Sequence, residues 1–393
     1  MDRNRLISFF KENPVIVRCI WSLARLFLRI WGCFVPLQKK TMIFSSFGGR
    51  KFDDSPKALY DEVCKRKEFD DWRLIWAFIN PDAYTLPRGE KMKIDTPAFF
   101  KALLYSRVWI SNSGMDRGIG LKRKCNIRIE TWHGTPLKKI GGEENQNSLR
   151  KRPEEIHTKI DRETIRCAQS NYDQVIFARI FRADISSILL CDLPRNDSLT
   201  KYTEERIRQI KNSINVSLRK KVILYVPTYR EYLNHADTSL KPPINISKWE
   251  TILGEEYVLL VRAHYAVTKA LEIENSPFVK DVSAYPFIND LYAISDILLS
   301  DYSSAYFDYA ILDRPMLCYA YDKDEYEKKR GLYLDLDKVL PCEVDYTEDS
   351  LIKHIVKLNY KDAVEKSKRF HQKYAPYSGD ACKVVVDKLI SRL

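Results

Sequence analysis

The pattern that most constrains this chain is a regular alternation, from about residue 40 onward, of short apolar runs with amphipathic stretches of roughly 10 to 15 residues. Such an alternation is typical of α/β folds, in which helices join parallel strands and cover the faces of the sheet. The length of 393 residues allows two such domains. The apolar runs predict strands over 41–45, 73–78, 108–112, 127–131 and 187–191 in the first half, and over 221–226, 257–262, 278–282, 296–300 and 315–319 in the second.

A charged segment at 202–219 separates the two sets of strands, and we interpret it as the connection between two domains. We therefore predict an amphipathic segment over residues 1–39, a Rossmann-like domain over 40–205 and a second Rossmann-like domain over 206–393. The second domain includes, by chain order, a final helix at 380–393 that could pack on either half. Two such domains facing one another place the ligand crevice between them, at the carboxyl ends of both sheets.

The N-terminal stretch from residue 6 to 37 is very apolar, but charged residues interrupt it before a run long enough to span a membrane accumulates. It also lacks the uninterrupted apolar region and the cleavage site of a signal peptide. Arg18, Arg25 and Arg29 are seven and four residues apart, so a helix stacks them on one face beside a Trp-rich apolar surface. This pattern favours an amphipathic helix on an anionic membrane surface over the alternative, a helix packed on the protein's own core.

The net charge of +12 comes from two zones. Residues 1–51 hold ten Lys and Arg against two Asp and Glu, and residues 115–152 hold ten against four. These zones coincide with the apolar helix and with a loop after a strand, and there is no RRM or KH signature, so the charge does not indicate nucleic-acid binding. The nine cysteines are scattered without a CxxC pair, which favours a reduced, cytosolic compartment.

A histidine follows the predicted strand at 127–131, in the sequence WHGTPLKKIG. His133 on such a loop can reach the crevice, and the ordinary histidine pKa of about 6.5 suits a general base at neutral pH. A lone histidine can equally cap a turn. Gly134, Lys138 and Lys139 favour the functional interpretation, because they add close backbone approach and positive charge suited to a phosphorylated ligand.

Two strand ends in the second half carry cationic side chains. Arg262 and His264 end one predicted strand, and Thr228 and Arg230 follow another. Arginines in these positions can bind phosphate oxygens in a bidentate manner, although each could also form a surface ion pair.

The sequence DYSS follows a third strand and places Ser303 and Ser304 at the start of an amphipathic helix, with Asp301 just before them. A serine there can cap free backbone N–H groups, and the helix N-terminus attracts anions. Capping alone explains one serine. The pair of serines, together with the cationic side chains on neighbouring strand ends, favours a diphosphate site.

The ordered motifs of this chain resemble those of the CDP-glycerol glycerophosphotransferases of wall teichoic acid synthesis. They are WHGTPLKKIG (132–141), LPRNDSL (193–199), PTYR (227–230), RAHY (262–265) and the long segment at 281–333. The resemblance covers roughly residues 40–375 and implies a GT-B-like fold, in which the second domain holds most of the nucleotide. The sequence departs from the family in two places. Cys191-Asp192 stands where members often have a glycine before the PRND segment, and RAHY replaces the more usual variants of that motif.

The resemblance also implies roles by position. His133 is the implied catalytic base, and His264 is the second catalytic residue, beside the donor phosphates. The implied donor-binding residues are Arg262, Thr228, Arg230, Asp301, Ser303 and Ser304. The residues expected on the acceptor side are Asn112, Gly134, Thr135, Lys138 and Lys139. The segment 281–289 is expected to border the cytidine.

The implied reaction transfers glycerol phosphate from CDP-glycerol to a hydroxyl of a lipid-linked, undecaprenyl diphosphate disaccharide and releases CMP, at the cytoplasmic face of a bacterial membrane. The short sequence before the core resembles the primase branch, which adds the first unit. The alternatives are a poly(glycerol phosphate) or ribitol phosphate transferase of the same family, and a GT-B glycosyltransferase that uses a nucleotide sugar. No carboxylate cluster indicates a metal site, and the sequence leaves a divalent metal and the oligomeric state open.

Overall fold

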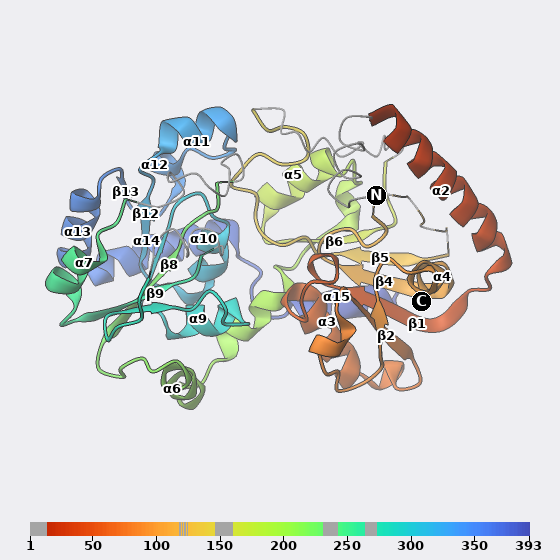
Figure 1. The fold of residues 1–393 in the computed structure, drawn as a ribbon, viewed down its shortest axis with the longest axis horizontal. Coiled ribbons are helices and arrows are strands. Elements are labelled where there is room, and N and C mark those ends of the chain that lie inside the picture. Colours follow the sequence, from red (N-terminus) through yellow and green to blue (C-terminus); the bar gives the residue numbers. More distant parts are fainter. Residues whose placement is uncertain are drawn as a thin grey trace, which may run out of the picture.

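Two parallel sheets form the framework of the molecule, one in each of the two lobes that lie side by side in Figure 1. The computed structural model describes residues 14–145 without 118, 120, 122 and 124, and residues 160–230, 243–263 and 273–393, with side chains from residue 22 onward. Within these ranges the N-terminal sheet has the strand order β3-β2-β1-β4-β5-β6-β7 and the C-terminal sheet the order β10-β9-β8-β11-β12-β13. The predicted α/β fold with two halves is confirmed.

The N-terminal lobe alternates strands with helices along the chain. Its strands are β1 (Gln38–Ser45), β2 (Arg73–Phe78), β3 (Glu90–Lys93), β4 (Ser106–Ser111), β5 (Ile127–Glu130), β6 (Ile165–Ala168) and β7 (Ile188–Leu190), and its helices include α3 (Asp54–Lys65), α4 (Pro97–Tyr105), α5 (Asn171–Ile180) and the 3-10 helix η5 (Pro194–Lys201). Along β1, Met42 and Phe44 join the core on one face of the sheet and Ile43 joins the core on the other. The strand is therefore buried on both faces, as expected of a central parallel strand.

The C-terminal lobe repeats this plan on a second sheet. Its strands are β8 (Lys221–Val226), β9 (Tyr257–Val261), β10 (Val279–Asp281), β11 (Ile297–Ser300), β12 (Met316–Tyr319) and β13 (Val344–Asp345). Its helices include α6 (Glu204–Ser213), α7 (Ile246–Leu253), α9 (Ile288–Ile294), α10 (Ala305–Tyr309), α11 (Lys323–Lys329), α12 (Leu336–Val339), α13 (Glu348–Val356) and α14 (Tyr360–Tyr374).

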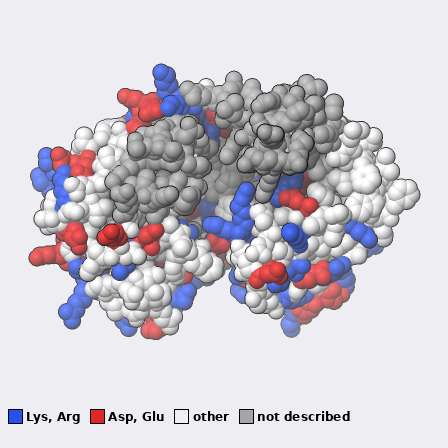
Figure 2. All heavy atoms as spheres, in the orientation of Figure 1, with Lys and Arg blue, Asp and Glu red and all other residues white. Residues whose placement is uncertain are grey.

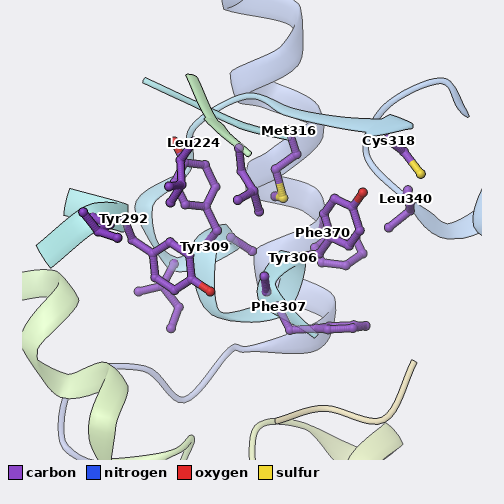
Figure 3. Packing of buried hydrophobic residues seen from close by; sticks show 14 of the residues in the cluster. Leu224, Tyr292, Tyr306, Phe307, Tyr309, Met316, Cys318, Leu340 and Phe370 are labelled. Atoms are coloured by element: carbon purple, nitrogen blue, oxygen red, sulfur yellow. The ribbon is translucent and has the colours of Figure 1, made fainter. Parts of the chain in front are cut away.

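Aromatic side chains hold the short helix α10 in the core of the C-terminal lobe. Tyr306, Phe307 and Tyr309 are fully buried, and Figure 3 shows them among residues from β12, α9 and α14. The hydroxyl of Tyr306 donates to Leu317 O at 3.2 Å, and that of Tyr309 to Ser295 O at 3.0 Å. Because these hydroxyls have partners, the rings stabilise α10 without a desolvation penalty and fix the residues that precede it.

The last helix, α15 (Ala381–Ile390), returns to the N-terminal lobe. Its apolar residues belong to the same core cluster as β1 and α3, and the carboxylate of Asp197 accepts the backbone N–H groups of Ala381 and Cys382, each at 2.8 Å. Chain order had placed this helix in the second domain, and its packing joins it to the first instead. Asp197, which lies on η5, thus supplies hydrogen-bond acceptors for the free N–H groups at the N-terminus of α15.

The N-terminal helix α2 (Pro14–Phe34) lies along the outer side of the N-terminal lobe. Leu28 is buried in the cluster around α4, and the Arg25 Nε donates to Ile119 O at 2.7 Å. Five large apolar residues of α2 nevertheless remain between 54% and 79% exposed, namely Leu23, Leu26, Phe27, Ile30 and Phe34. The helix therefore packs on the lobe and presents an apolar surface at the same time. The side chain of Arg18 lies outside the described residues.

The strands that sequence patterns missed have identifiable reasons. Strand β3 is the charged edge sequence EKMK, β13 has two residues, and in β6 an arginine interrupts the apolar run. Arg166 is 8% exposed there, and its Nη2 donates to Asp161 at 2.9 Å. A buried ion pair of this kind leaves no apolar periodicity to detect.

Candidate active site

His133 lies three residues beyond β5, on a loop at the carboxyl edge of the N-terminal sheet. Its neighbour Trp132 has a φ of 57°, and the two rings stack with their centroids 4.2 Å apart. His133 Nδ1 lies 2.9 Å from the carbonyl oxygen of Asn112. Because a carbonyl oxygen only accepts, Nδ1 carries the proton in this contact, and the neutral ring presents Nε2 as its basic nitrogen.

The surroundings of His133 favour its neutral form. Burial lowers the pKa of the imidazole below its usual value, against the opposing influence of the Asn112 hydrogen bond and the negative charge of Asp54. The charges of Arg195 and Lys138 lower the pKa further. A neutral imidazole at pH 7 is ready to accept a proton, which is the state that a general base requires.

Asn112 follows β4 and holds this corner of the site together. Its Oδ1 accepts the backbone N–H of Phe47 at 2.8 Å, and its Nδ2 donates to Ser46 Oγ at 3.3 Å. The side chain is fully buried. Asn112 was predicted to contact the acceptor, but its amide is engaged inside the lobe, and its carbonyl reaches the site only through His133.

The histidine loop contacts the C-terminal lobe at Gly134. A β-carbon built on Gly134, which has a φ of 149°, would lie 2.6 Å from Ser304 Oγ and 2.9 Å from Ser304 Cβ. Such distances are shorter than a real side chain tolerates, so only glycine fits here. The structure thus brings together two motifs, one from each lobe, that the sequence placed on opposite sides of a crevice.

Other residues of the histidine loop have structural partners. Thr135 is 1% exposed, and its hydroxyl lies 2.8 Å from Gln169 Oε1 and 2.9 Å from Asp173 Oδ2. The predicted contact of Thr135 with a ligand does not agree with this placement. Lys138 forms an antiparallel bridge with Leu332 of the C-terminal lobe. The Lys139 N–H donates to Gly331 O at 3.1 Å, and its Nζ donates to Asn145 Oδ1 at 2.9 Å.

An ion network that sequence reasoning did not assign connects the lobes beside His133. Arg195 on η5 donates through Nη1 to Asp54 Oδ2 and through Nη2 to Asp308 Oδ2, both at 2.6 Å, and Nη1 also reaches the His133 carbonyl at 3.1 Å. Asn196 Nδ2 donates to the second oxygen of Asp308 at 2.9 Å. Arg195 and Asn196 both belong to the motif LPRNDSL. Their partners, however, are distant in the chain, so no local sequence pattern indicates the network.

Arg230, predicted to bind the donor, forms ion pairs within the C-terminal lobe. Its guanidinium is 3% exposed and donates to Asp301 Oδ2 and to both oxygens of Asp322, each at 2.8 Å. Asp301 Oδ1 in turn accepts the Thr228 N–H at 2.9 Å. These contacts pair the charge of Arg230 with two carboxylates of its own lobe and connect the loops after β8 and β11.

Arg262, Thr228, Ser303 and Ser304, all predicted to bind the donor, are each partly exposed. Arg262 is partly exposed after β9 and donates through Nη1 to Tyr285 O at 2.5 Å. Burial lowers the pKa of its guanidinium, against the opposing influence of nearby acidic groups such as Asp53. Ser303 Oγ accepts the N–H of Ala305 at 3.1 Å, and both serines are partly exposed.

The Thr228 hydroxyl is buried and has no hydrogen-bond partner among the described residues. His264, the second predicted catalytic residue, lies outside the described residues. Across the part of the chain that is described, no group of three or more His, Cys, Asp or Glu side chains is placed to hold a metal ion.

A profile of the family described as CDP-Glycerol:Poly(glycerophosphate) glycerophosphotransferase matches residues 27–391. The chain belongs to this family. The motif-based prediction of a CDP-glycerol glycerophosphotransferase is thereby confirmed.

Relatives in this glycerophosphotransferase family match nearly the whole chain. The teichoic acid glycerol-phosphate transferase of Staphylococcus aureus is 33% identical over 353 residues, which are 86% of this chain and 89% of that protein. The solved structure of the wall teichoic acid polymerase TagF superposes with a TM-score of 0.83 at 29% identity, covering 100% of this chain and 98% of that one. The likeness includes both lobes.

Length does not separate the branches of the glycerophosphotransferase family. The chain spans 44% of the teichoic acid poly(glycerol phosphate) polymerase of Staphylococcus epidermidis, to which it is 35% identical over 79% of its own length. The polymerase of the same name from Bacillus spizizenii is 30% identical and is matched over 97% of this chain and 98% of that protein. A polymerase can therefore have this length, and the argument from length for the primase branch carries no weight.

Proposed function

We propose that this glycerophosphotransferase transfers glycerol phosphate from CDP-glycerol to a hydroxyl of a lipid-linked saccharide in teichoic acid synthesis, with His133 as the general base. The observation that carries the proposal is the approach of Gly134 to Ser304. It sets the loop that bears the basic Nε2 of His133 directly beside the start of α10. A donor bound at α10 with its phosphates near Ser303 and Ser304 then lies next to the base.

The proposed step is an in-line displacement at the glycerol-bearing phosphorus. The acceptor hydroxyl loses its proton to His133 Nε2, its oxygen forms the new phosphodiester bond, and the bond from phosphorus to the bridging oxygen breaks as CMP leaves. Arg262 and the hydroxyls of Thr228, Ser303 and Ser304 stabilise the negative charge on the donor phosphates. These residues come from the carboxyl ends of neighbouring strands, as expected for ligand sites in open parallel sheets.

The acceptor proposed for the reaction is an undecaprenyl diphosphate disaccharide, and the first transfer is the primase reaction. The relatives support a glycerol phosphate acceptor equally, because both primases and polymerases match this chain. The acceptor hydroxyl is expected on the side of His133 that faces the N-terminal lobe, near Gly134, Lys138 and Lys139.

One experiment tests both the reaction and the acceptor. The purified chain is incubated with CDP-glycerol or CDP-ribitol and with either a soluble lipid disaccharide or the same disaccharide already carrying one glycerol phosphate, and the products are measured by mass spectrometry. The proposal expects a mass gain of one glycerol phosphate and an equal amount of CMP. Release of CDP without CMP would instead indicate a glycosyltransferase, and transfer only to the pre-primed acceptor would indicate a polymerase.

We also propose that α2 attaches the enzyme peripherally to the cytoplasmic face of the membrane, where the lipid-linked acceptor resides. The exposed apolar residues of α2 support this proposal, and Figure 2 shows the surface over α2 as a largely uncharged area at the right edge. Arg29 is exposed beside them and can meet anionic headgroups. None of the described helices is long and apolar enough to cross a bilayer.

A further inference from the structure

Arg195 touches three segments that are far apart in the sequence. Its Nη1 donates to Asp54 at the start of α3 and to the carbonyl of His133, and its Nη2 donates to Asp308 on α10. The side chains of Arg195, Asp54 and Asp308 are 10%, 7% and 4% exposed. A forked guanidinium can hold two carboxylates and a carbonyl in fixed directions, which the single nitrogen of a lysine cannot do.

We propose that Arg195 is a positioning residue for catalysis, which fixes the backbone of His133 against the C-terminal lobe and thereby sets where its basic nitrogen stands. The inference rests on the proposed function, in which His133 is the base. Arg195 is held from its own side as well, because Asn289 Nδ2 on α9 donates to the Arg195 carbonyl at 2.7 Å. Residues of both lobes therefore hold Arg195 in place, and Arg195 in turn holds the loop that bears His133.

The same contacts couple Arg195 to the protonation of His133. The charged groups that influence the imidazole are Asp54 from α3, Arg195 from η5 and Lys138 from its own loop. Asp54 raises the pKa of His133, whereas Arg195 and Lys138 lower it. Removing the positive charge of Arg195 should therefore raise the pKa of His133, and neutralising Asp54 should lower it. Both shifts would show that these charges lie close to the imidazole in the folded protein, and Arg195→Lys tests the positioning role separately.

The first experiment measures the His133 titration without relying on activity. The full chain is labelled with 13C-histidine, the signal of His133 is assigned with His133→Gln, and the titration is followed by NMR in wild type, Arg195→Met and Asp54→Asn. The proposal expects an upward shift in Arg195→Met and a downward shift in Asp54→Asn. Unchanged titration in both folded variants would overturn the coupling.

The second experiment separates position from charge. Arg195→Lys retains a positive charge but loses the fork, so kcat should fall by about 10- to 100-fold through misplacement of the base, while the donor KM and the pKa of His133 change much less. The matched control is Arg88→Lys, because one guanidinium nitrogen of Arg88 likewise donates to three groups, the backbone carbonyls of Phe69, Asp70 and Trp72, at the other side of the N-terminal lobe. Arg88→Lys should leave kcat and the titration unchanged.

The outcomes distinguish this inference from the proposed function. Full activity in His133→Ala would refute His133 as the base, and the Arg195 proposal as a consequence. If His133→Ala is inactive but Arg195→Lys retains the kcat of wild type, the proposed function stands and the positioning role is wrong. Should Arg195→Met not fold, Arg195→Lys and Asp54→Asn still decide the matter, because each retains part of the buried network.

Discussion

The α-carbon of Gly134 faces the hydroxyl of Ser304 across the boundary between the two lobes, at a distance that leaves no space for a methyl group. This contact joins the histidine loop of one sheet to the first turn of α10 on the other. It makes the relative position of the lobes a direct determinant of the candidate site.

Gly134→Ala is therefore expected to push the lobes apart at the site and to abolish most of the transfer activity. The control is Gly114→Ala. Gly114 also has a positive φ, of 64°, but an added β-carbon would meet nothing within 4 Å, so this variant reports the backbone cost alone, about 1 kcal/mol. If the clash is the cause, the double variant Gly134→Ala with Ser304→Gly should recover part of the activity lost in the single variant. Equal activity in Gly134→Ala and Gly114→Ala would contradict the steric argument.

The pH dependence of transfer is expected to follow His133. Burial lowers the pKa of this residue, so the neutral, basic form persists below the pH at which an exposed histidine becomes protonated. Turnover should thus remain constant from pH 7 down through the usual histidine range and fall only at lower pH. His133→Gln, which keeps a hydrogen-bonding group but cannot take up the proton, should lose about 10²- to 10⁴-fold in kcat. Retention of most of the activity with an unshifted pH profile would rule out the base.

Substitution of Arg230 is expected to reduce the stability of the fold, and substitution of Arg262 is expected to reduce donor binding. Arg230→Met leaves the buried carboxylates of Asp301 and Asp322 without their cation and should destabilise the fold by about 3 to 5 kcal/mol, measured by urea denaturation. Arg262→Ala should leave the urea midpoint nearly unchanged and weaken CDP-glycerol binding in calorimetric titration. The reverse pattern, a stable Arg230→Met with weak donor binding, would indicate that Arg230 binds the donor phosphates.

Ionisation of the buried Asp192 carboxyl is expected to lower the stability of the folded protein as the pH rises. Burial raises the pKa of this carboxyl to about 8, with its Oδ1 accepting the Leu193 N–H at 2.6 Å. The folded state therefore binds a proton that the unfolded state releases near pH 4, and the free energy of unfolding should decrease between those pH values.

Asp192→Asn removes this ionisation while keeping the acceptor, and asparagine also tolerates the φ of 66° found here. The variant should be more stable than wild type at pH 8 and similar at pH 4. Thermal unfolding at the two pH values provides the comparison. A constant difference at both would mean that ionisation of Asp192 is not the cause.

Membrane attachment through α2 is expected to depend on its exposed apolar residues. Phe27→Glu combined with Ile30→Glu should reduce sedimentation with anionic liposomes and leave the unfolding temperature unchanged, because these side chains are 65% and 54% exposed. The control is Val356→Glu, at an apolar residue 60% exposed on the C-terminal lobe. Undiminished sedimentation of the double variant would contradict the role of α2.

Sequence patterns located most strands because the apolar periodicity of a buried parallel strand is a local property. They failed at β3 and at β6, where a solvent-facing edge and the buried Arg166 replace that periodicity. Motif order was sufficient to identify the family, and it placed His133 and Ser304 at strand ends. It could not indicate that Thr135, Arg230 and Asp301 are engaged inside the lobes, because a side chain's partners depend on residues distant in the chain.

The sequence by itself determined the class of fold, the family and the residues that end each strand, since these follow from spacing along the chain. Only the tertiary structure decided that Gly134 meets Ser304, that Arg195 connects Asp54 with Asp308, and that α15 packs on the N-terminal lobe. Contacts of this kind exist only where the two sheets and the returning C-terminal helix pack together. Their energies depend on burial and on the exact approach of groups that lie far apart in the sequence, and no local pattern records that approach.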